Sequence, residues 1–389
     1  NLRKTNLWYR LSNSPFLRGL ISLPFLKDLF YLIFPPSNFL GIPIFLGPKR
    51  FFYKLKEKKV NYVVLRWFEN LPSFNGISDI DILVEDIYFQ EIRSNLTRFP
   101  LFSCINVDLS IMSAPQKLIN YIPYYPHNLA EQILKNSFYL KGYIKVPNTK
   151  LYFWSLAYHT LYHKGFKSNI DSKYNGIYEN FNFNSKYLKQ LEKLSKLDTE
   201  LPAILPNTTL ENIHKILEIV NWVPTLDTLY KLKEKNEWIA SYLADEESNM
   251  GNSVNDKLVV FFVRESNSHQ VERIEKFIIA AGLTKPLTIK LNTEEIKIAT
   301  KSVRGNSWPL NDGGAPSHLI ITSLQNAIRK PYIEVVGSLK KKIRKDNILR
   351  SAGKKFGFSN VVHSSDSGIL AYHYISIIKP SVLESIISL

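Results

Sequence analysis

The spacing of apolar residues early in the chain predicts two short strands, a helix and a third strand. Residues 61–65 and 80–84 are apolar at strand spacing, and we expect them to pair as a hairpin. Residues 87–99 carry apolar side chains at helical spacing, and residues 103–112 return to the strand pattern. This order indicates a small domain of the α+β class.

A longer region from His127 to Ala244 is apolar mainly at helical spacing. We therefore expect a helical region after the small sheet. Its candidate helices cover residues 129–135, 152–164, 187–194, 210–220 and 227–243.

A polar run from Asp245 to Asp256 separates the helical region from the last third of the chain. Acidic and amide side chains of this kind cannot bury apolar surface, so we expect a linker and the main domain boundary here. Beyond it, the pattern predicts an α+β domain, with a helix at 271–281 and strands at 258–263, 287–291 and 319–322.

These patterns divide the 389 residues into an apolar and basic segment (1–58), a small-sheet domain (59–126), a helical region (127–244), the linker (245–256) and a last domain (257–389). In the first segment, charges and prolines interrupt each apolar run before it reaches the ~20 residues of a membrane-spanning helix. We expect this segment to cover the first domain. The alternative is an interfacial position on a membrane.

Composition supports folded domains and a negatively charged partner. Hydrophobic residues make up 45% of the chain and aromatic residues 13%, which excludes global disorder. The net charge of +16 predicts attraction to phosphorylated substrates, nucleic acid or an acidic membrane surface. A single cysteine, Cys104, excludes an intramolecular disulfide and indicates a reducing compartment. We expect a core thiol and a cytoplasmic protein, peripheral at the membrane in the interfacial alternative.

Three aspartates are candidates for a metal site. Asp79 and Asp81 lie two residues apart on a predicted strand, so both carboxylates leave the same face. Asp108 lies on the third predicted strand, which can place it beside them. Magnesium prefers such hard oxygen ligands and supports phosphoryl transfer. The alternative is that the acidic residues are solvent-facing positions of an edge strand.

The segment Gly76-Ile77-Ser78-Asp79-Ile80-Asp81, followed by Asp108, resembles the nucleotidyltransferase superfamily over about residues 59–164. The resemblance implies a nucleotidyltransferase-like fold in which Asp79, Asp81 and Asp108 hold magnesium and a nucleoside triphosphate. The family's Gly-Ser element is missing, because residues 65–70 occupy its place. Arg66 in that stretch is a candidate substitute for contact with phosphate.

His159 and His163 stand one helical turn apart. A zinc site needs at least a third ligand, so structural histidines or phosphate contacts are the favoured interpretation. Lys164 and Lys167 follow directly, and we expect them to act as cations beside a triphosphate.

Near the end of the chain, the segment Asn360-Val361-Val362-His363-Ser364-Ser365-Asp366-Ser367 places one histidine among small polar residues. A neutral imidazole can attack phosphorus and form a phosphohistidine. His363 is therefore a candidate nucleophile.

This segment resembles the active-site motif of nucleoside diphosphate kinases, with a likeness over about residues 257–378. The resemblance implies a ferredoxin-like domain that binds nucleoside di- or triphosphates and associates as a homo-oligomer. It assigns phosphoryl acceptance to His363, a sugar or phosphate contact to Asn360, phosphate clamping to Arg350, and hydrogen-bond support to Ser365.

Several positions depart from that family. Arg264 stands where the family has a lysine, Ser364 replaces a glycine, and Tyr374 replaces the glutamate that steadies the imidazole. The loop expected over 332–350 is shorter than in the family, and we expect its basic run, 340–345, to be solvated or to bind nucleic acid or acidic lipid.

The leading hypothesis is a magnesium-dependent nucleotidyl or phosphoryl transferase, with a second module that replenishes or binds its nucleotide. The acceptor stays open among a sugar phosphate, a polyol, a protein and a nucleic acid. The alternative is a nucleotide-binding sensor or scaffold in which both sites are degenerate. The missing Gly-Ser element and Tyr374 favour that alternative.

Overall fold

The computed structural model describes residues 39–73, 79–112, 123–174, 185–250, 257–304, 308, 313–325, 330–352 and 360–383. The fold belongs to the α+β class, as expected. The chain forms two compact units that interleave in sequence. The first contains residues 1–113, 129–156 and 194–201, and the second contains residues 114–128, 157–193 and 202–389.

Parts of the predicted segments lie outside the described residues, namely 1–38 of the N-terminal segment, 76–78 of the motif before Asp79, and 251–256 of the linker. Within the part of the chain that is described, no helix has the length and apolar character needed to cross a membrane.

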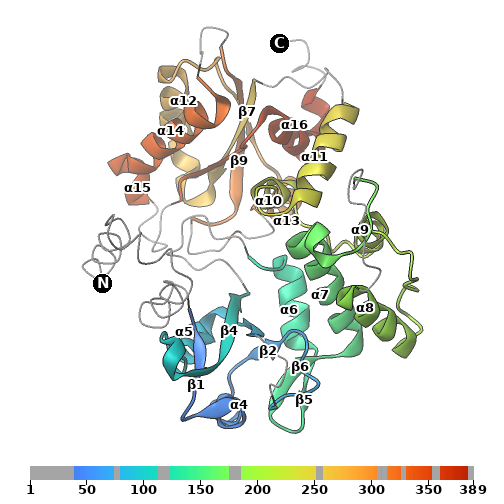
Figure 1. Ribbon diagram of the computed structural model, residues 1–389. Coiled ribbons are helices and arrows are strands. Elements are labelled where there is room, and N and C mark those ends of the chain that lie inside the picture. The colour runs from blue at the N-terminus through green and yellow to red at the C-terminus, as the bar shows by residue number, and fades with distance from the viewer. Residues whose placement is uncertain are drawn as a thin grey trace, which may run out of the picture. The chain divides into compact units, whose positions relative to one another are not determined.

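The first unit contains a sheet with the strand order β1-β4-β3-β2 (Figure 1). Its strands are β1 (Gly41–Pro43), β2 (Tyr62–Val64), β3 (Asp79–Val84) and β4 (Ser103–Ile111). Strands β2 and β3 pair antiparallel, which confirms the predicted hairpin, whereas β3 and β4 run parallel. The short strand β1 follows no clear apolar pattern and was not predicted.

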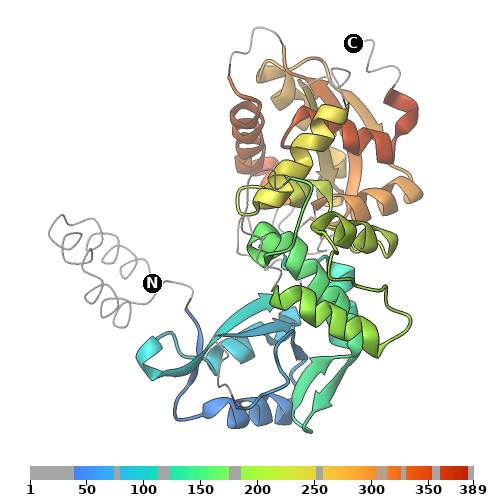
Figure 2. The same ribbon diagram turned by 45° about the vertical axis from the view of Figure 1, so that its right-hand side comes forward.

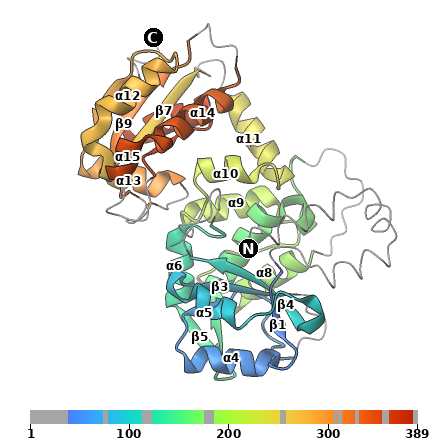
Figure 3. The ribbon, with the colours of Figure 1, turned by 90° about the vertical axis from the view of Figure 1, so that its left-hand side faces the viewer.

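Two helices connect these strands. Helix α4 (Gly47–Glu57) has a proline in its first turn, a favourable position because a helix leaves its first N–H groups unpaired. It packs beside the sheet (Figure 3), and its Phe52 ring stacks on Tyr62 of β2. The helix expected over 87–99 is shorter than predicted, because a 3₁₀ turn leads into α5 (Phe89–Ser94) and the chain then turns toward β4.

A hairpin interrupts the region expected to be helical. Helix α6 (His127–Lys135) leads into β5 (Ser137–Leu140) and β6 (Ile144–Pro147), which lies next to β2 (Figure 2), and α7 (Thr149–Tyr158) follows. Lys141 and Gly142 both adopt positive φ in the turn, as tight hairpin turns require. The strand-like run 137–147 was missed because it is short and flanked by helical patterns.

The second unit begins with helices. A π-helix (His159–Lys164) continues directly from α7, and α8 (Lys186–Leu197) and α9 (Leu210–Ile219) follow. The predicted helix over 227–243 is broken into α10 (Leu226–Leu232) and α11 (Glu237–Met250). Because α11 continues to Met250, the first half of the expected linker is helical.

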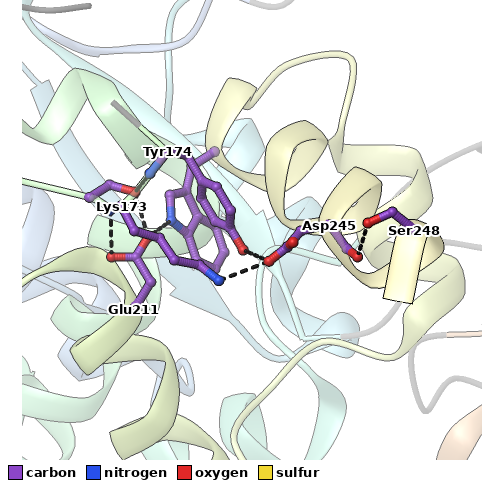
Figure 4. A network of polar contacts seen from close by, with 7 residues as sticks. Lys173, Tyr174, Glu211, Asp245 and Ser248 are labelled. Carbon is purple, nitrogen blue, oxygen red and sulfur yellow. Dashed lines mark hydrogen bonds and ion pairs between the residues drawn. The ribbon is translucent and has the colours of Figure 1, made fainter. Parts of the chain in front are cut away.

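A polar network explains why this part of the expected linker is structured (Figure 4). Asp245 of α11 accepts hydrogen bonds from the Lys173 ammonium at 2.8 Å and from the Tyr174 hydroxyl at 3.0 Å. Glu211 of α9 accepts from the Trp238 indole N–H at 2.9 Å. Asp245, the first residue of the run, is therefore paired with residues far away in the sequence, which composition alone does not reveal.

The second unit also contains an antiparallel sheet with the strand order β10-β7-β9-β8. All three strands predicted here are present, with small shifts of their ends. The strands are β7 (Leu258–Arg264), β8 (Leu287–Lys290), β9 (Pro316–Ser323) and β10 (Val362–Ser364).

Helices cover both faces of this sheet (Figure 1). The face with Val260 and Phe262 packs on α13 (Thr293–Ser302) and α16 (Gly368–Ile378). The opposite face, with Phe261, packs on α12 (Val271–Ala280) and α14 (Tyr332–Lys345). Burial on both faces accounts for the unbroken apolar run of β7.

The loop expected over 332–350 is an error of the sequence prediction, because α14 and α15 (Asn347–Ala352) occupy it. Apolar side chains of α14 at helical spacing, Val336, Leu339 and Ile343, are buried. The basic run obscured this pattern, since Lys341 and Lys342 lie exposed between the buried positions of the same helix.

Candidate functional site

The three aspartates converge in the first unit. Parallel pairing sets Asp79 of β3 against Asn106 and Asp81 directly against Asp108 of β4. Each of the three side chains offers a carboxylate oxygen, and these oxygens all lie within 4.8 Å of one another. Two oxygens bound to one Mg²⁺ at ~2.1 Å lie at most ~4.2 Å apart, so only a small inward movement of the side chains would bring all three onto one ion. The expected convergence of this acidic cluster, Asp79, Asp81 and Asp108, is therefore present.

Electrostatics within the acidic cluster suit a cation. Partial burial raises the pKa of Asp108, although the residue as a whole is exposed, and the charges of Asp81 and Asp79 raise that pKa further. Arg66 opposes the shift, because its guanidinium lies close by. Like charges gathered this tightly are stabilised by a positive ion.

Arg66 is held by the acidic cluster. Its Nη2 donates to Asp81 Oδ1 at 2.6 Å, and both side chains are largely buried. Arg66 therefore positions Asp81, and its expected role as a phosphate contact stays a prediction. The neighbouring backbone N–H of Trp67 donates to the Tyr152 hydroxyl, which in turn donates to Glu69 at 3.4 Å. Sequence reasoning missed Tyr152 and Glu69, because nothing local links α7 to residues 65–70.

The two histidines on the π-helix have structural contacts in the second unit. The His163 ring stacks on Tyr124 at 3.8 Å, and its Nε2 lies 2.8 Å from the Tyr124 carbonyl. His159 Nδ1 contacts the Tyr124 hydroxyl. Among the residues that the structure describes, only the three aspartates group as potential metal ligands. The favoured interpretation of the histidines, structural or phosphate contacts, stays a prediction.

Lys164 and Lys167 also belong to the second unit, whereas the acidic cluster belongs to the first. Lys164 is half-buried and Lys167 is exposed. Their expected contact with a triphosphate stays a prediction. Cys104, expected in the core, is only half-buried; its thiol donates to the Ile42 carbonyl, and burial raises its pKa.

His363 lies inside the second unit on β10. Its side chain faces Phe262, Trp308 and Tyr374, with ring centroids 5.9 to 6.3 Å away, and the residue is only 7% exposed. Within the described residues its Nε2 has no hydrogen-bond partner. Tyr374 therefore does stand beside the histidine, as the motif implied, without bonding to it.

Cations gather around this imidazole. Burial lowers the pKa of His363 well below its ordinary value, and the charges of Lys340, Arg304, Lys231 and Arg264 lower it further, so the ring is neutral. Arg264 and Arg304 both lie over the Trp308 ring, with guanidinium carbons 4.5 and 5.3 Å from its centroid. We call Arg264, Arg304, Lys231 and Lys340 the cationic cluster.

The lowered pKa of Lys340 shows that burial and the neighbouring charges of this cluster disfavour its charged form. Burial, with the nearby Arg344, lowers the pKa of Lys340 from 10.5 to about 8, and only Asp366 opposes the shift appreciably. Of these residues, sequence reasoning had selected only Arg264 as a binding residue. The others come from α10, α14 and the end of α13, and no motif connects them.

Other motif residues have structural roles. Ser365 is fully buried; its hydroxyl accepts from the Val260 N–H at 3.0 Å and lies 2.7 Å from the Tyr332 hydroxyl. Ser367 caps α16 by accepting from the Leu370 N–H at 3.1 Å. Ser365 therefore hydrogen-bonds to β7 and α14, and Ser367 fixes the start of α16.

The two remaining predicted nucleotide contacts lie near the same sheet. Arg350 is exposed on α15, and Asn360 is half-buried just before β10. Gly313 approaches the Asn360 carbonyl so closely that a Cβ there would lie 3.0 Å from it. No contact places Arg350 in the cationic cluster, so its role as a phosphate clamp stays a prediction.

Comparison with known proteins identifies no relative. No family model matches the chain, no curated protein matches it, and no solved structure matches it. The geometry of the two clusters therefore has to support any functional conclusion.

Proposed function

We propose that the chain is a metal-dependent nucleotidyl or phosphoryl transferase whose reaction takes place at the acidic cluster. The observation that carries this proposal is the register of β3 and β4, which brings three carboxylates within 4.8 Å. Three clustered aspartates form the donor set that Mg²⁺ prefers. The strand order and the resemblance to nucleotidyltransferases support the same conclusion.

In this proposal Asp79, Asp81 and Asp108 hold Mg²⁺, with a nucleoside triphosphate as substrate. The ion supplies positive charge that neutralises phosphate oxygens during transfer. Arg66 fixes the orientation of Asp81 through its 2.6 Å ion pair. Nothing in the first unit selects the acceptor among a sugar phosphate, a polyol, a protein or a nucleic acid.

Metal binding can be tested without knowing the acceptor. We expect the full chain to bind Mn²⁺, a spectroscopic substitute for Mg²⁺, in an electron paramagnetic resonance titration, and Asp81→Asn to weaken that binding. Asp86→Asn is the matched control, because Asp86 is exposed just beyond β3 and outside the cluster. Equal Mn²⁺ affinity in wild type and Asp81→Asn would contradict the proposal. Pyrophosphate release from labelled triphosphates then tests the reaction itself.

A second candidate function concerns the second unit, and the cationic cluster carries it. We infer that this unit binds the phosphates of a nucleotide beside His363, because the charges of four cations act on a buried neutral imidazole and Asp366 is the main charge that opposes the low pKa of Lys340. The antiparallel order β10-β7-β9-β8 agrees with the ferredoxin-like fold that the kinase resemblance implies. Burial of His363 and its tyrosine neighbour favour binding without turnover.

Incubation with γ-labelled ATP and magnesium separates binding from transfer. We expect retention of nucleotide without acid-labile, alkali-stable label on the protein. Label that forms on wild type and disappears in His363→Ala would instead establish a phosphohistidine and make this unit a phosphotransferase.

A further inference from the structure

The first unit exposes a group of large apolar side chains at one end of its sheet. Solitary exposed apolar residues are common, but neighbouring ones mark interaction surfaces. Phe45 is 81% exposed, and the others are between 51% and 61% exposed. The members of this apolar patch are Ile44, Phe45, Phe99, Leu101 and Phe102.

Backbone pairing makes these residues one surface. The Ile44 N–H donates to the Phe102 carbonyl at 2.9 Å, directly beyond the β1–β4 pairing of Pro43 with Ser103. Phe99 and Phe102 meet edge to face with ring centroids 6.3 Å apart. The turn that begins at Ile44 and the 3₁₀ turn before β4 therefore present their apolar side chains together.

The charged residues beside the apolar patch are all basic. The two segments that form it, 41–50 and 96–105, contain Lys49, Arg50 and Arg98 and no acidic residue. All three basic residues are exposed. Apolar side chains next to exposed cations match the interface of an anionic bilayer, where the rings enter the headgroup region and the cations attract acidic lipids.

The sequence that leads into β1 has the same chemistry. Residues 1–40 contain five basic residues and one acidic residue, together with many Leu, Phe and Ile. The apolar patch is therefore continuous along the chain with a second basic and apolar stretch. This continuity favours a lipid surface over a protein partner. A long stretch of basic and apolar residues is typical of segments that bind anionic lipid.

We propose that the apolar patch docks the protein on an anionic membrane surface. From Phe102 to Asp108 the chain advances six residues along β4, or ~20 Å at ~3.4 Å per residue. Docking would hold the acidic cluster near the membrane. The proposal does not depend on the chemistry at that cluster, because it concerns binding alone.

Flotation of the full chain with lipid vesicles tests the proposal. We expect binding to vesicles that contain phosphatidylserine and little binding to pure phosphatidylcholine. Phe45→Asp combined with Phe102→Asp should weaken binding at least about tenfold, because both rings then carry charge into the interface. Phe138→Asp is the matched control, since Phe138 is 51% exposed on β5 of the same unit.

A second variant tests the electrostatic part. Lys49→Gln with Arg50→Gln should lower binding to phosphatidylserine vesicles about fivefold for each charge removed. Lys341→Gln with Lys342→Gln, two exposed charges on α14, should change it little. Equal binding to both lipids, or wild-type binding by the Phe45/Phe102 variant, would overturn the proposal. So would a multimer, detected by light scattering, that the same variant converts to monomers.

Discussion

The acidic cluster and the cationic cluster concentrate charge by opposite routes. The first needs only two adjacent parallel strands, whose register sets Asp81 against Asp108. The second gathers cations from four separate segments around one imidazole on β10. Local geometry suffices to bring three carboxylates together, whereas gathering cations near one buried ring needs contributions from distant parts of a unit.

The largest expected effect concerns the acidic cluster. Asp81→Asn should reduce metal-dependent nucleotidyl transfer by more than about 100-fold, because even residues that only support a metal ligand contribute about 10- to 100-fold. Release of pyrophosphate from labelled triphosphate with Mg²⁺ measures this. Asp86→Asn should retain the rate. A similar loss in both variants would mean that general acidity, and not the cluster, matters.

The next effect concerns the cationic cluster. Lys340→Gln should weaken binding of inorganic pyrophosphate about tenfold, the scale of one charge-assisted hydrogen bond. Calorimetric titration provides the affinity, and Lys341→Gln on the exposed side of α14 is the control. Wild-type affinity in Lys340→Gln would exclude this lysine from the site.

The same lysine predicts a pH dependence. Because the pKa of Lys340 is lowered to about 8 in the folded protein, its charge is lost as pH rises through 8. Pyrophosphate affinity should therefore fall above pH 8 in wild type and change less in Lys340→Gln. Parallel pH profiles for the two proteins would contradict the assignment.

A smaller effect separates structural from binding roles in the histidine motif. Ser365→Ala should destabilise the protein by about 1–3 kcal/mol, because it leaves the buried Val260 N–H without its acceptor. Chemical denaturation measures the loss. Pyrophosphate affinity should be retained, and a selective loss of that affinity at unchanged stability would restore the binding role that the sequence suggested.

The smallest expected effect is a gain in thermal stability. The raised pKa of Asp108 means that the folded, metal-free protein holds a proton that the unfolded chain releases above its ordinary pKa of 3.8. Stability therefore falls as pH rises from that value through the raised pKa, and the loss persists at neutral pH. Asp108→Asn should slightly raise the melting temperature without metal and reduce the rise that Mn²⁺ causes. A lower melting temperature in metal-free Asp108→Asn would contradict this.

The acidic cluster was predicted well because the sequence pattern that reveals it is local. Alternation along β3 fixes the face of Asp79 and Asp81, and one further strand supplies Asp108. The sequence also predicted β7, β8 and β9 of the second sheet but not the short strand β10. It failed where contacts between distant segments decide the structure, as with the Asp245 network. The helix α14 was missed although its apolar spacing is local, because the basic run drew attention away from it. Arg304 and Lys340 were beyond reach, since packing alone brings them to His363.

The parallel pairing of β3 and β4 has a consequence for how the protein assembles. The antiparallel pair of β2 and β3 carries two aspartates, but Asp108 joins them only after the crossover through α5 has brought β4 into place. A metal ion bound by all three carboxylates would therefore recognise the completed sheet and not its precursor. By mass action, such an ion would act as a ligand for folding, so the cellular metal concentration would set how much of this unit is native.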